Sequence, residues 1–298
     1  MHSETVNIDS SLVQRLVGAQ FPQWADLPVR EIIPNGWDNR TFRLGEHMSV
    51  RLPSALRYTP QVEKEQRWLP KLAPFLPLPI PAPRAVGKPA AGYPFPWSVY
   101  GWIDGDTAST DLVSDMPRFA TLLAEFLVAL QSIDPTGGPE PGTHNFYRGG
   151  DLATYDEETR RSIAILGNDL ETRAVTEVWE AALAATRRDR PVWIHGDISA
   201  GNLLVRDGLL TAVIDFGGIA VGDPSCDLAI AWTMFDGDSK DAFRAALPLD
   251  DATWARGCGW ALWKALIVMA KISDTNAVEA ENSRRTVSRI LADHWHGI

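Results

Sequence analysis

A proline-rich stretch between Pro74 and Pro96 limits the possible folds of this 298-residue chain more than any other feature. Proline lacks a backbone N–H and fixes φ, so a helix cannot run through repeated prolines. The stretch leaves room for a short strand around Ala85–Gly87. It separates a first part, in which extended segments mix with short helices, from a second part with mainly helical periodicity. At roughly 150 residues per domain, two lobes are expected.

The first part is predicted to contain a short opening helix, three extended segments and a second helix. The opening helix has Leu and Val at helical spacing behind a cap at Asp9 or Ser10, and Thr59-Pro60 is a start signal for the second helix. Asn35-Gly36 between the first two extended segments is a favoured hairpin turn. The predicted elements are Ser10–Gly18, Val29–Ile33, Thr41–Leu44, Ser49–Leu52 and about Pro60–Lys71.

A strand at Trp97–Ile103 runs into the turn Asp104-Gly105 and is taken as the boundary between lobes. The expected domains are 1–103 and 104–298, with a hinge at about 100–104. Beyond it, helices are predicted and then short strands separated by turn residues, followed by helices to the C-terminus. The predicted helices are Phe119–Ile133, about Leu152–Leu166 and Glu171–Arg187, and the predicted strands are Val192–Ile194, Leu203–Val205 and Thr211–Ile214. The fold class is therefore α+β.

The charge balance narrows the class of partner. With 38 acidic and 28 basic residues the formal net charge is -10, which argues against nucleic-acid binding. No apolar run is long enough for a membrane span, and the polar start does not resemble a secretion signal, so a cytoplasmic protein is expected. Two cysteines and six histidines show no zinc spacing, and Cys226 and Cys258 are interpreted as small buried residues.

The residues that carry chemistry lie between 193 and 217. Asp197 and Asn202 are separated by four residues, and Asp215 begins an Asp-Phe-Gly after another short apolar strand. In phosphoryl transfer one Asp accepts the hydroxyl proton while an Asn and a second Asp hold Mg²⁺ through hard oxygen ligands. His195-Gly196-Asp197 alone would fit a turn with a buried histidine. The ordered combination favours a catalytic site.

These residues resemble the aminoglycoside phosphotransferase family, whose members have a two-lobed, protein-kinase-like fold. The segments concerned are His195-Gly-Asp197, Asn202, Ile214-Asp215-Phe-Gly217 and Gly222-Asp-Pro-Ser-Cys-Asp227-Leu-Ala. The resemblance implies that Asp197 is the catalytic base, that Asn202 and Asp215 bind Mg²⁺, and that Asp227 braces the catalytic loop. It also implies a nucleotide triphosphate, ATP or GTP, as phosphate donor. Asp223 and Asp227 also suit a helix N-terminus, where Asp223 would be the cap.

In the first lobe, Gly36, Asp38 and Asn39 resemble the family's turn over the nucleotide phosphates, although the segment also reads as a plain hairpin. Arg51 occupies the place of the family's phosphate-binding Lys, and Glu65 that of its acidic partner. Arg is always charged and binds two oxygens in a fork, so the phosphate geometry would differ. Arg57 and Lys64 are competing candidates, and a solvated Arg51 on an edge strand is the alternative.

The segment Tyr100–Ile103 corresponds to the family's hinge, where main-chain atoms of Gly101 and Ile103 would bind the adenine edge. An ordinary buried strand explains the same residues. Trp254, Trp260 and Trp263 fall at helical spacing and are predicted to pack the core, although a Trp at the rim could stack on a substrate ring.

The acceptor is less well specified than the reaction. The expected activity is O-phosphorylation of an aminoglycoside-like or other antibiotic, and the resemblance equally allows a small hydroxylated metabolite such as choline, homoserine or a sugar amine. The net charge would suit a cationic acceptor, and so would the acids Asp236, Asp238, Asp250 and Asp251. The alternative is that these acids simply face solvent. Two further hypotheses are a nucleotide-binding pseudokinase and a metal-dependent hydrolase that uses His195 and Asp197.

Overall fold

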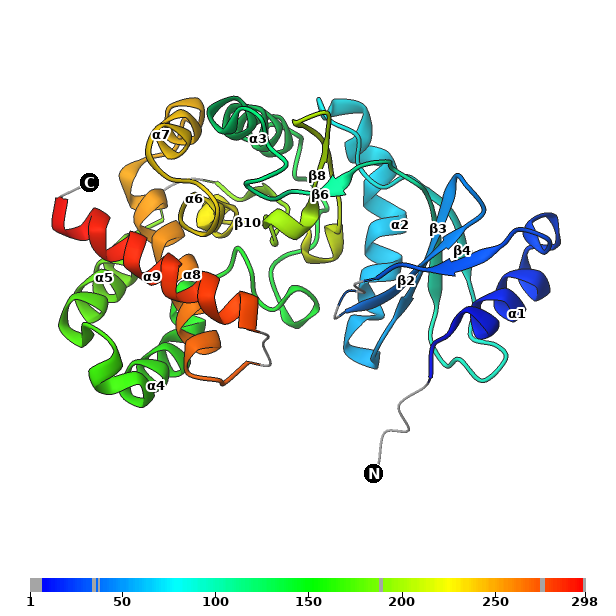
Figure 1. Cartoon of the computed structure of the whole chain (residues 1–298), viewed down its shortest axis with the longest axis horizontal. Coiled ribbons are helices and arrows are strands. Elements are labelled where there is room, and N and C mark those ends of the chain that lie inside the picture. The colour runs from blue at the N-terminus through cyan, green and yellow to red at the C-terminus, as the bar shows by residue number, and fades with distance from the viewer. Residues whose placement is uncertain (1–6, 34–35, 37, 188–189, 274–276, 297–298) are drawn as a thin grey trace. The chain divides into compact units, whose positions relative to one another are not determined.

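The computed structural model describes residues 7–33, 36, 38–187, 190–273 and 277–296. The chain forms two compact units, one made of Met1–Gly105 with Ala212–Gly217 and the other of Asp106–Thr211 with Gly218–Ile298. Most of their helices and strands are labelled in Figure 1. The chain therefore returns to the first unit for the short segment 212–217, which carries the Asp-Phe-Gly sequence.

The first unit is built on an antiparallel sheet with the strand order β1-β2-β3-β5-β4 within the described residues. The helices α1 (Ser10–Gln20) and α2 (Pro60–Leu72) both contact this sheet, and Figure 1 shows them on either side of it. The strands are β1 (Val29–Glu31), β2 (Asn39–Leu44), β3 (Met48–Pro53), β4 (Pro83–Gly87) and β5 (Trp97–Gly101).

Alternation along these strands gives the sheet two different faces. The apolar face packs with α1 in a core that contains Leu12, Val13, Leu16, Val17, Phe42, Leu44, Val50, Leu52, Trp97 and Val99. Arg51 and Tyr100 lie one position away from these core residues, so their side chains point to the other face. There they contact Glu65 of α2. The period of two thus places a polar cluster between the sheet and α2.

Of the two helix starts predicted in the first unit, one differs in the structure. Asp9 caps α1 by accepting from the Leu12 N–H at 2.8 Å, as predicted. Thr59 does not cap α2: it already has helical φ and ψ, and its hydroxyl donates back to Leu56 O. The cause is the 3-10 turn Leu56–Tyr58, which leads directly into the helix. Asn35, and with it the predicted hairpin turn, lies outside the described residues.

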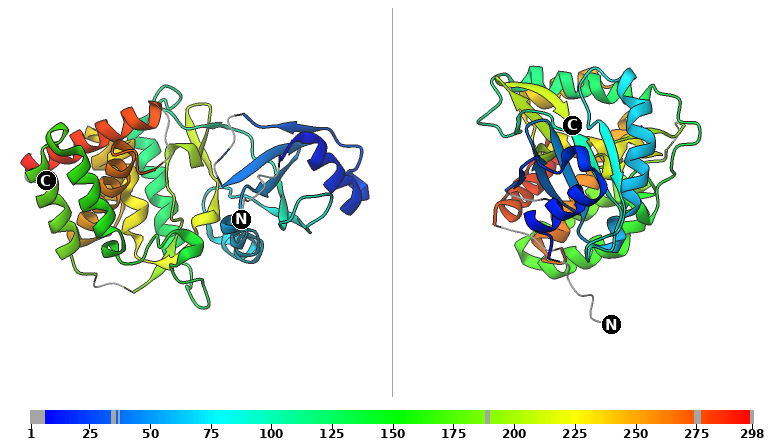
Figure 2. Two further views of the ribbon diagram at one scale, coloured as in Figure 1. Left: turned by 90° about the horizontal axis from the view of Figure 1, so that it is seen from below. Right: turned by 90° about the vertical axis from the view of Figure 1, so that its right-hand side faces the viewer.

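The second unit is mainly helical. In the views of Figures 1 and 2, α9 lies alongside α8, and these two helices are in extensive contact. Trp254, Trp260 and Trp263 of α8 are buried, which confirms their predicted core role. The helices are α3 (Met116–Gln131), α4 (Asp156–Leu166), α5 (Thr172–Ala184), α6 (Ile230–Thr233), α7 (Gly237–Ala246), α8 (Asp251–Met269) and α9 (Ala277–His296).

Short strands complete the second unit. β7 (Val192–Ile194) pairs with β10 (Ala220–Gly222), and β8 lies between β6 and β9. These last three strands are β6 (Asp106–Thr107), β8 (Leu203–Arg206) and β9 (Leu209–Val213), which ends in the segment that joins the first unit. The predicted helix at Leu152–Leu166 begins only at Asp156, because Leu152–Tyr155 is a 3-10 turn. The described part of the chain contains no helix with the length and hydropathy needed to cross a membrane.

Candidate active site

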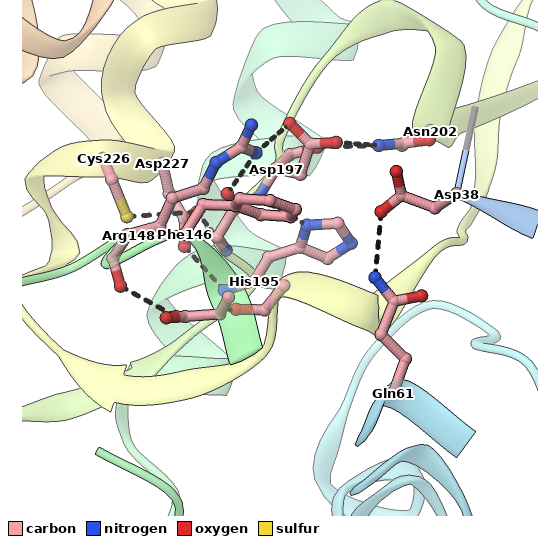
Figure 3. Close-up of polar contacts among 12 residues, drawn as sticks. Asp38, Gln61, Phe146, Arg148, His195, Asp197, Asn202, Cys226 and Asp227 are labelled. Carbon is pink, nitrogen blue, oxygen red and sulfur yellow. Dashed lines mark hydrogen bonds and ion pairs between the residues drawn. The ribbon is translucent and has the colours of Figure 1, made fainter. Parts of the chain in front are cut away.

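The loop that carries Asp197 connects β7 to β8 in the second unit and is held through its main chain. The carboxylate of Asp227 accepts the N–H of His195 at 2.8 Å and that of Gly196 at 2.7 Å (Figure 3). Asp227 is fully buried in the 3-10 helix η9 (Pro224–Ala229). Burial raises its pKa, and His195 with the two amide donors acts in the opposite direction. Asp227 therefore braces this loop.

Gly196 is required at its place in the loop. Its φ is +82°, and a Cβ there would lie 2.4 Å from the carbonyl oxygen of Gly218. Next to it, the fully buried His195 accepts the Asp197 N–H at its Nδ1, 3.2 Å away. His195 therefore acts inside the loop as a structural residue. The described residues contain no cluster of three metal-binding His, Cys, Asp or Glu side chains.

The Asp197 carboxylate remains accessible, with 48% of its side chain exposed. Arg148, from the loop before α4, forms an ion pair with its Oδ1 (Figure 3). Asn202, at the end of the 3-10 turn Ala200–Asn202, donates from Nδ2 to Asp197 O at 2.8 Å and to Oδ2 at 3.2 Å. An ionised carboxylate in this position is able to accept a proton from a bound hydroxyl group.

The first unit holds a second charged cluster around Arg51. One guanidinium nitrogen lies 2.7 Å from Asp215 Oδ1 and another lies 3.3 Å from Glu65 Oε1. The Tyr100 hydroxyl donates to Glu65 Oε2. Asp215 follows β9 with φ at +64°, a conformation uncommon outside glycine. The cluster links strand β3, helix α2 and the Asp-Phe-Gly segment inside one unit.

Burial would lower the pKa of Arg51, but Asp215 and Glu65 outweigh it and raise that pKa above its ordinary value. Burial also raises the pKa of Glu65, and the charge of Arg51 opposes this shift. Of the two competing cations, Arg57 stacks on the Tyr58 ring, and Lys64 is buried, with its pKa lowered to about 8 by burial. Arg51 is therefore the cation placed on Asp215.

The predicted phosphate turn is organised by a side chain that sequence reasoning did not single out. Gln61, buried on α2, donates to Asp38 Oδ2 at 2.9 Å and accepts from Asn39 Nδ2 at 3.0 Å. A Cβ on Gly217 would lie 2.7 Å from Gln61 Cδ, so glycine allows this close approach. Gly36 is exposed, and its carbonyl accepts from Arg40. Gln61 lies in the polar first turn of α2, so nothing in the sequence indicated that its side chain would be buried.

At the predicted hinge, the main-chain amides of Gly101 and Trp102 are already engaged in the first unit. Gly101 N–H donates to Ala82 O at 2.8 Å, and Trp102 N–H donates to His47 O at 2.8 Å. Strand β5 ends at Gly101, and Ile103 follows it half-buried. A nucleotide base could not use the Gly101 amide without breaking a bond of the fold. The predicted contact with the adenine edge would therefore have to use main-chain atoms other than the Gly101 amide.

The two predicted Mg²⁺ ligands supply the right donor chemistry. The amide nitrogen of Asn202 is directed to Asp197, which leaves its oxygen as the ligand atom, and Asp215 supplies a carboxylate that also pairs with Arg51. Both are hard oxygen donors of the kind that Mg²⁺ requires. Each lies in a different unit of the chain.

Most acids suggested as attractors of a cationic acceptor have structural partners. Asp250 caps α8 by accepting the Thr253 N–H at 2.7 Å, and Asp223 caps η9 as predicted. Asp236 pairs with Arg289 and Asp251 with Arg244, while Asp238 lies in the first turn of α7. Their positions at helix starts explain their presence without a ligand.

Cys226 is buried as predicted, whereas Cys258 is only half-buried.

The profile of the phosphotransferase enzyme family, APH, matches residues 29–260. The chain belongs to this family. The match includes the predicted phosphate turn, the Arg51 cluster and the whole segment from His195 to Asp227. A comparison with curated proteins gave no significant match.

Solved structures of APH enzymes share the two-lobed, kinase-like fold. A mutant of aminoglycoside 2′-phosphotransferase-IIIa with GDP has 18% identity and a TM-score of 0.73 over 97% of this chain and 99% of that one. The streptomycin-ATP-APH(2″)-IIa complex has 19% identity and a TM-score of 0.61 over 97% and 99%. Macrolide 2′-phosphotransferase from Brachybacterium faecium has 21% identity and a TM-score of 0.59 over 95% and 97%. At these identities the comparison establishes the fold.

Proposed function

We propose that this APH protein is a Mg²⁺-dependent kinase that transfers the γ-phosphoryl group of ATP or GTP to a hydroxyl group of a small molecule. The observation that supports this best is Asp197. The two residues before it, His195 and Gly196, are fixed by the buried carboxylate of Asp227, while the carboxylate of Asp197 is half-exposed between Arg148 and Asn202. Such a group is held rigidly and is still open to an incoming hydroxyl. Both properties are required of a catalytic base in phosphoryl transfer.

In the proposed reaction Asp197 takes the proton of the acceptor hydroxyl as its oxygen attacks the γ-phosphorus. Asn202 and Asp215 would hold Mg²⁺, which neutralises charge on the donor phosphates when bound. Arg51, kept charged by Asp215 and Glu65, would neutralise phosphate oxygens. The turn of Gly36, Asp38 and Asn39 would cover the phosphates, and Gln61 sets the orientation of the last two.

For the acceptor we propose an aminoglycoside-like antibiotic first. Similar solved structures include phosphotransferase complexes with streptomycin and with gentamicin and a macrolide phosphotransferase, which supports testing these classes together. The use of Asp236 and Asp250 at helix starts weakens the argument from acidic charge. A small hydroxylated metabolite such as choline or homoserine is therefore the second acceptor class.

The test is nucleoside diphosphate release with Mg²⁺ and ATP or GTP, measured across aminoglycosides, macrolides and small amino alcohols. We expect acceptor-dependent release from the wild type and a loss of at least about 100-fold in kcat in Asp197→Asn, because the amide cannot accept the proton. Omission of Mg²⁺ should abolish release. Nucleotide affinity should be nearly unchanged in the variant.

A matched control is Asp207→Asn. Asp207 is exposed in the turn after β8 with φ at +53°, a conformation that Asn tolerates, so the same charge is removed without loss of turnover. Nucleotide binding without turnover for any acceptor would favour the pseudokinase. Absence of both binding and turnover would contradict the kinase proposal.

A further inference from the structure

Among the described residues, Arg148 is the only one that forms an ion pair with Asp197. Nothing in the sequence around Arg148 predicted this contact. It belongs to the loop between α3 and α4, far in sequence from the loop that carries the base. One guanidinium nitrogen, Nη1, donates both to Asp197 Oδ1 and to the carbonyl oxygen of Gly196, the latter at 2.7 Å. Arg148 thus holds the side chain of the base and the main chain beside it.

The loop that presents Arg148 is itself tightly held. Asn145, almost fully buried, accepts the Gly142 N–H at 2.9 Å and donates to the carbonyl oxygens of Arg148 at 2.9 Å and Gly218 at 3.2 Å. Asp223 N–H donates to Gly149 O at 2.7 Å on the other side of Arg148. These bonds fix the backbone from which the guanidinium extends.

The same loop adopts an uncommon backbone conformation immediately before Arg148. Phe146 and Tyr147 both have left-handed φ, +55° and +53°, although neither is glycine. Such residues persist only when surrounding contacts impose the conformation, and they concentrate at functional sites. Here the imposed bonds are Tyr147 N–H to Gly142 O and Tyr155 hydroxyl to Phe146 O. The result is an arginine directed to the base, as Figure 3 shows.

The two carboxylate oxygens of Asp197 have different partners. Oδ1 carries the charged partner Arg148, whereas Oδ2 has a longer, neutral hydrogen bond from Asn202 at 3.2 Å. A charge-assisted bond is stronger than a neutral one, so Oδ1 is the anchored oxygen. Oδ2, with the weaker partner, is then the oxygen better placed to accept a proton.

We propose that Arg148 is a positioning residue that fixes the catalytic carboxylate so that Asp197 Oδ2 receives the acceptor proton. This inference rests on the proposed function. In the step, the hydroxyl proton moves to Oδ2 and the hydroxyl oxygen forms a bond to the γ-phosphorus. The bond from that phosphorus to the bridging oxygen of the nucleoside diphosphate breaks, and Asp197 later returns the proton to solvent. Arg148 keeps its charge throughout and never contacts the reacting atoms.

The experiment compares wild type, Arg148→Ala, Arg148→Lys and the control Arg160→Ala with an acceptor identified as above. Arg160 is an arginine of the same unit whose ion pairs, with Asp156 and Glu180, lie at the surface. We expect Arg148→Ala to lower kcat about 10- to 100-fold, the usual effect of losing a residue that orients another. Nucleotide and acceptor KM should stay within about twofold.

Two further measurements separate positioning from a merely structural role. Added guanidinium chloride at millimolar concentration should restore part of the kcat of Arg148→Ala and leave Arg160→Ala unaffected. Arg148→Lys should retain more activity than Arg148→Ala, because it can donate to one of the two oxygens. In the double variant with Asp197→Asn, loss of Arg148 should cause no further decrease, since Arg148 acts through that carboxylate.

The outcomes are distinguishable. Normal kcat in a folded Arg148→Ala, or an additive loss in the double variant, would overturn the positioning role and leave the kinase proposal intact. Absence of acceptor-dependent turnover in the wild type would overturn the proposed function and this inference with it. If Arg148→Ala fails to fold, Arg148→Lys decides: full activity would contradict the need for a guanidinium with two acceptors.

Discussion

The Arg51–Glu65 pair of the first unit is buried, whereas the Asp197 carboxylate of the second unit is open. Glu65 and Arg51 expose only 4% and 12% of their side chains, while Asp197 exposes 48%. Burial and two carboxylate partners restrict the geometry of Arg51, as the proposed contact with phosphate oxygens would require. Exposure leaves Asp197 within reach of a ligand, as the proposed proton transfer would require. In this proposal the same kinds of charged residue serve different tasks according to how much water reaches them.

The largest effect on folding is expected from Arg51→Ala. It leaves Glu65 buried beside Tyr100 without its cation, which should lower the free energy of unfolding by about 3–5 kcal/mol. Urea denaturation followed by circular dichroism measures this. The paired variant Arg51→Met with Glu65→Gln keeps an acceptor for the Tyr100 hydroxyl and should recover most of the loss. No recovery would mean that packing by Arg51, rather than its charge, stabilises the cluster.

A smaller and opposite effect is expected from Lys64→Met. Lys64 loses its proton near pH 8 in the folded protein but only near its ordinary pKa of 10.5 when unfolded. Between these pH values the unfolded chain binds more protons at Lys64 than the folded protein does. The contribution of this group to the free energy of unfolding of the wild type therefore increases with pH in this range. Below pH 8 the variant should be more stable, by up to about 3 kcal/mol, and the difference should fall by pH 10.5. Thermal unfolding at pH 7 and 10 tests this, and a constant difference would contradict it.

The smallest effect on stability is expected for the open carboxylate. Asp197→Asn should change the free energy of unfolding by less than about 1 kcal/mol, because exposed ion pairs contribute little. Turnover should nevertheless be lost. Urea denaturation of this variant beside Arg51→Ala gives the contrast directly. A loss as large as that of Arg51→Ala would show that the Arg148 pair is a main support of the fold.

Much of this arrangement could be predicted from sequence because local signals are strong where strands alternate. Val50 and Leu52 bracket Arg51, so its placement opposite the core follows from a period of two. The elements β6 (Asp106–Thr107) and β10 (Ala220–Gly222) escaped prediction because neither contains a run of apolar residues that would give a strand pattern. They form by pairing with Leu204–Val205 and Val192–Ile194. Thr59 was interpreted as a cap because the preceding 3-10 turn leaves no distinct pattern.

The contacts that organise the candidate site were the least predictable. Gln61 meets Asp38 and Asn39 across more than 20 positions of sequence, and Arg148 meets Asp197 across 49. No periodicity or spacing links such pairs, because they depend on the path of two loops. Motif residues could be recognised singly, whereas the side chains that orient them became visible only in three dimensions.

The return of segment 212–217 to the first unit has a consequence for recombination within the family. The first unit is not one continuous stretch, since its Asp215 is encoded after most of the second unit. A gene fusion that exchanges residues up to Gly105 would transfer Arg51 and Glu65 without the aspartate that Arg51 contacts. Natural or engineered chimaeras should therefore succeed only when both segments of the first unit, 1–105 and 212–217, come from the same parent. Otherwise the two parents must carry compatible residues at 51, 65 and 215.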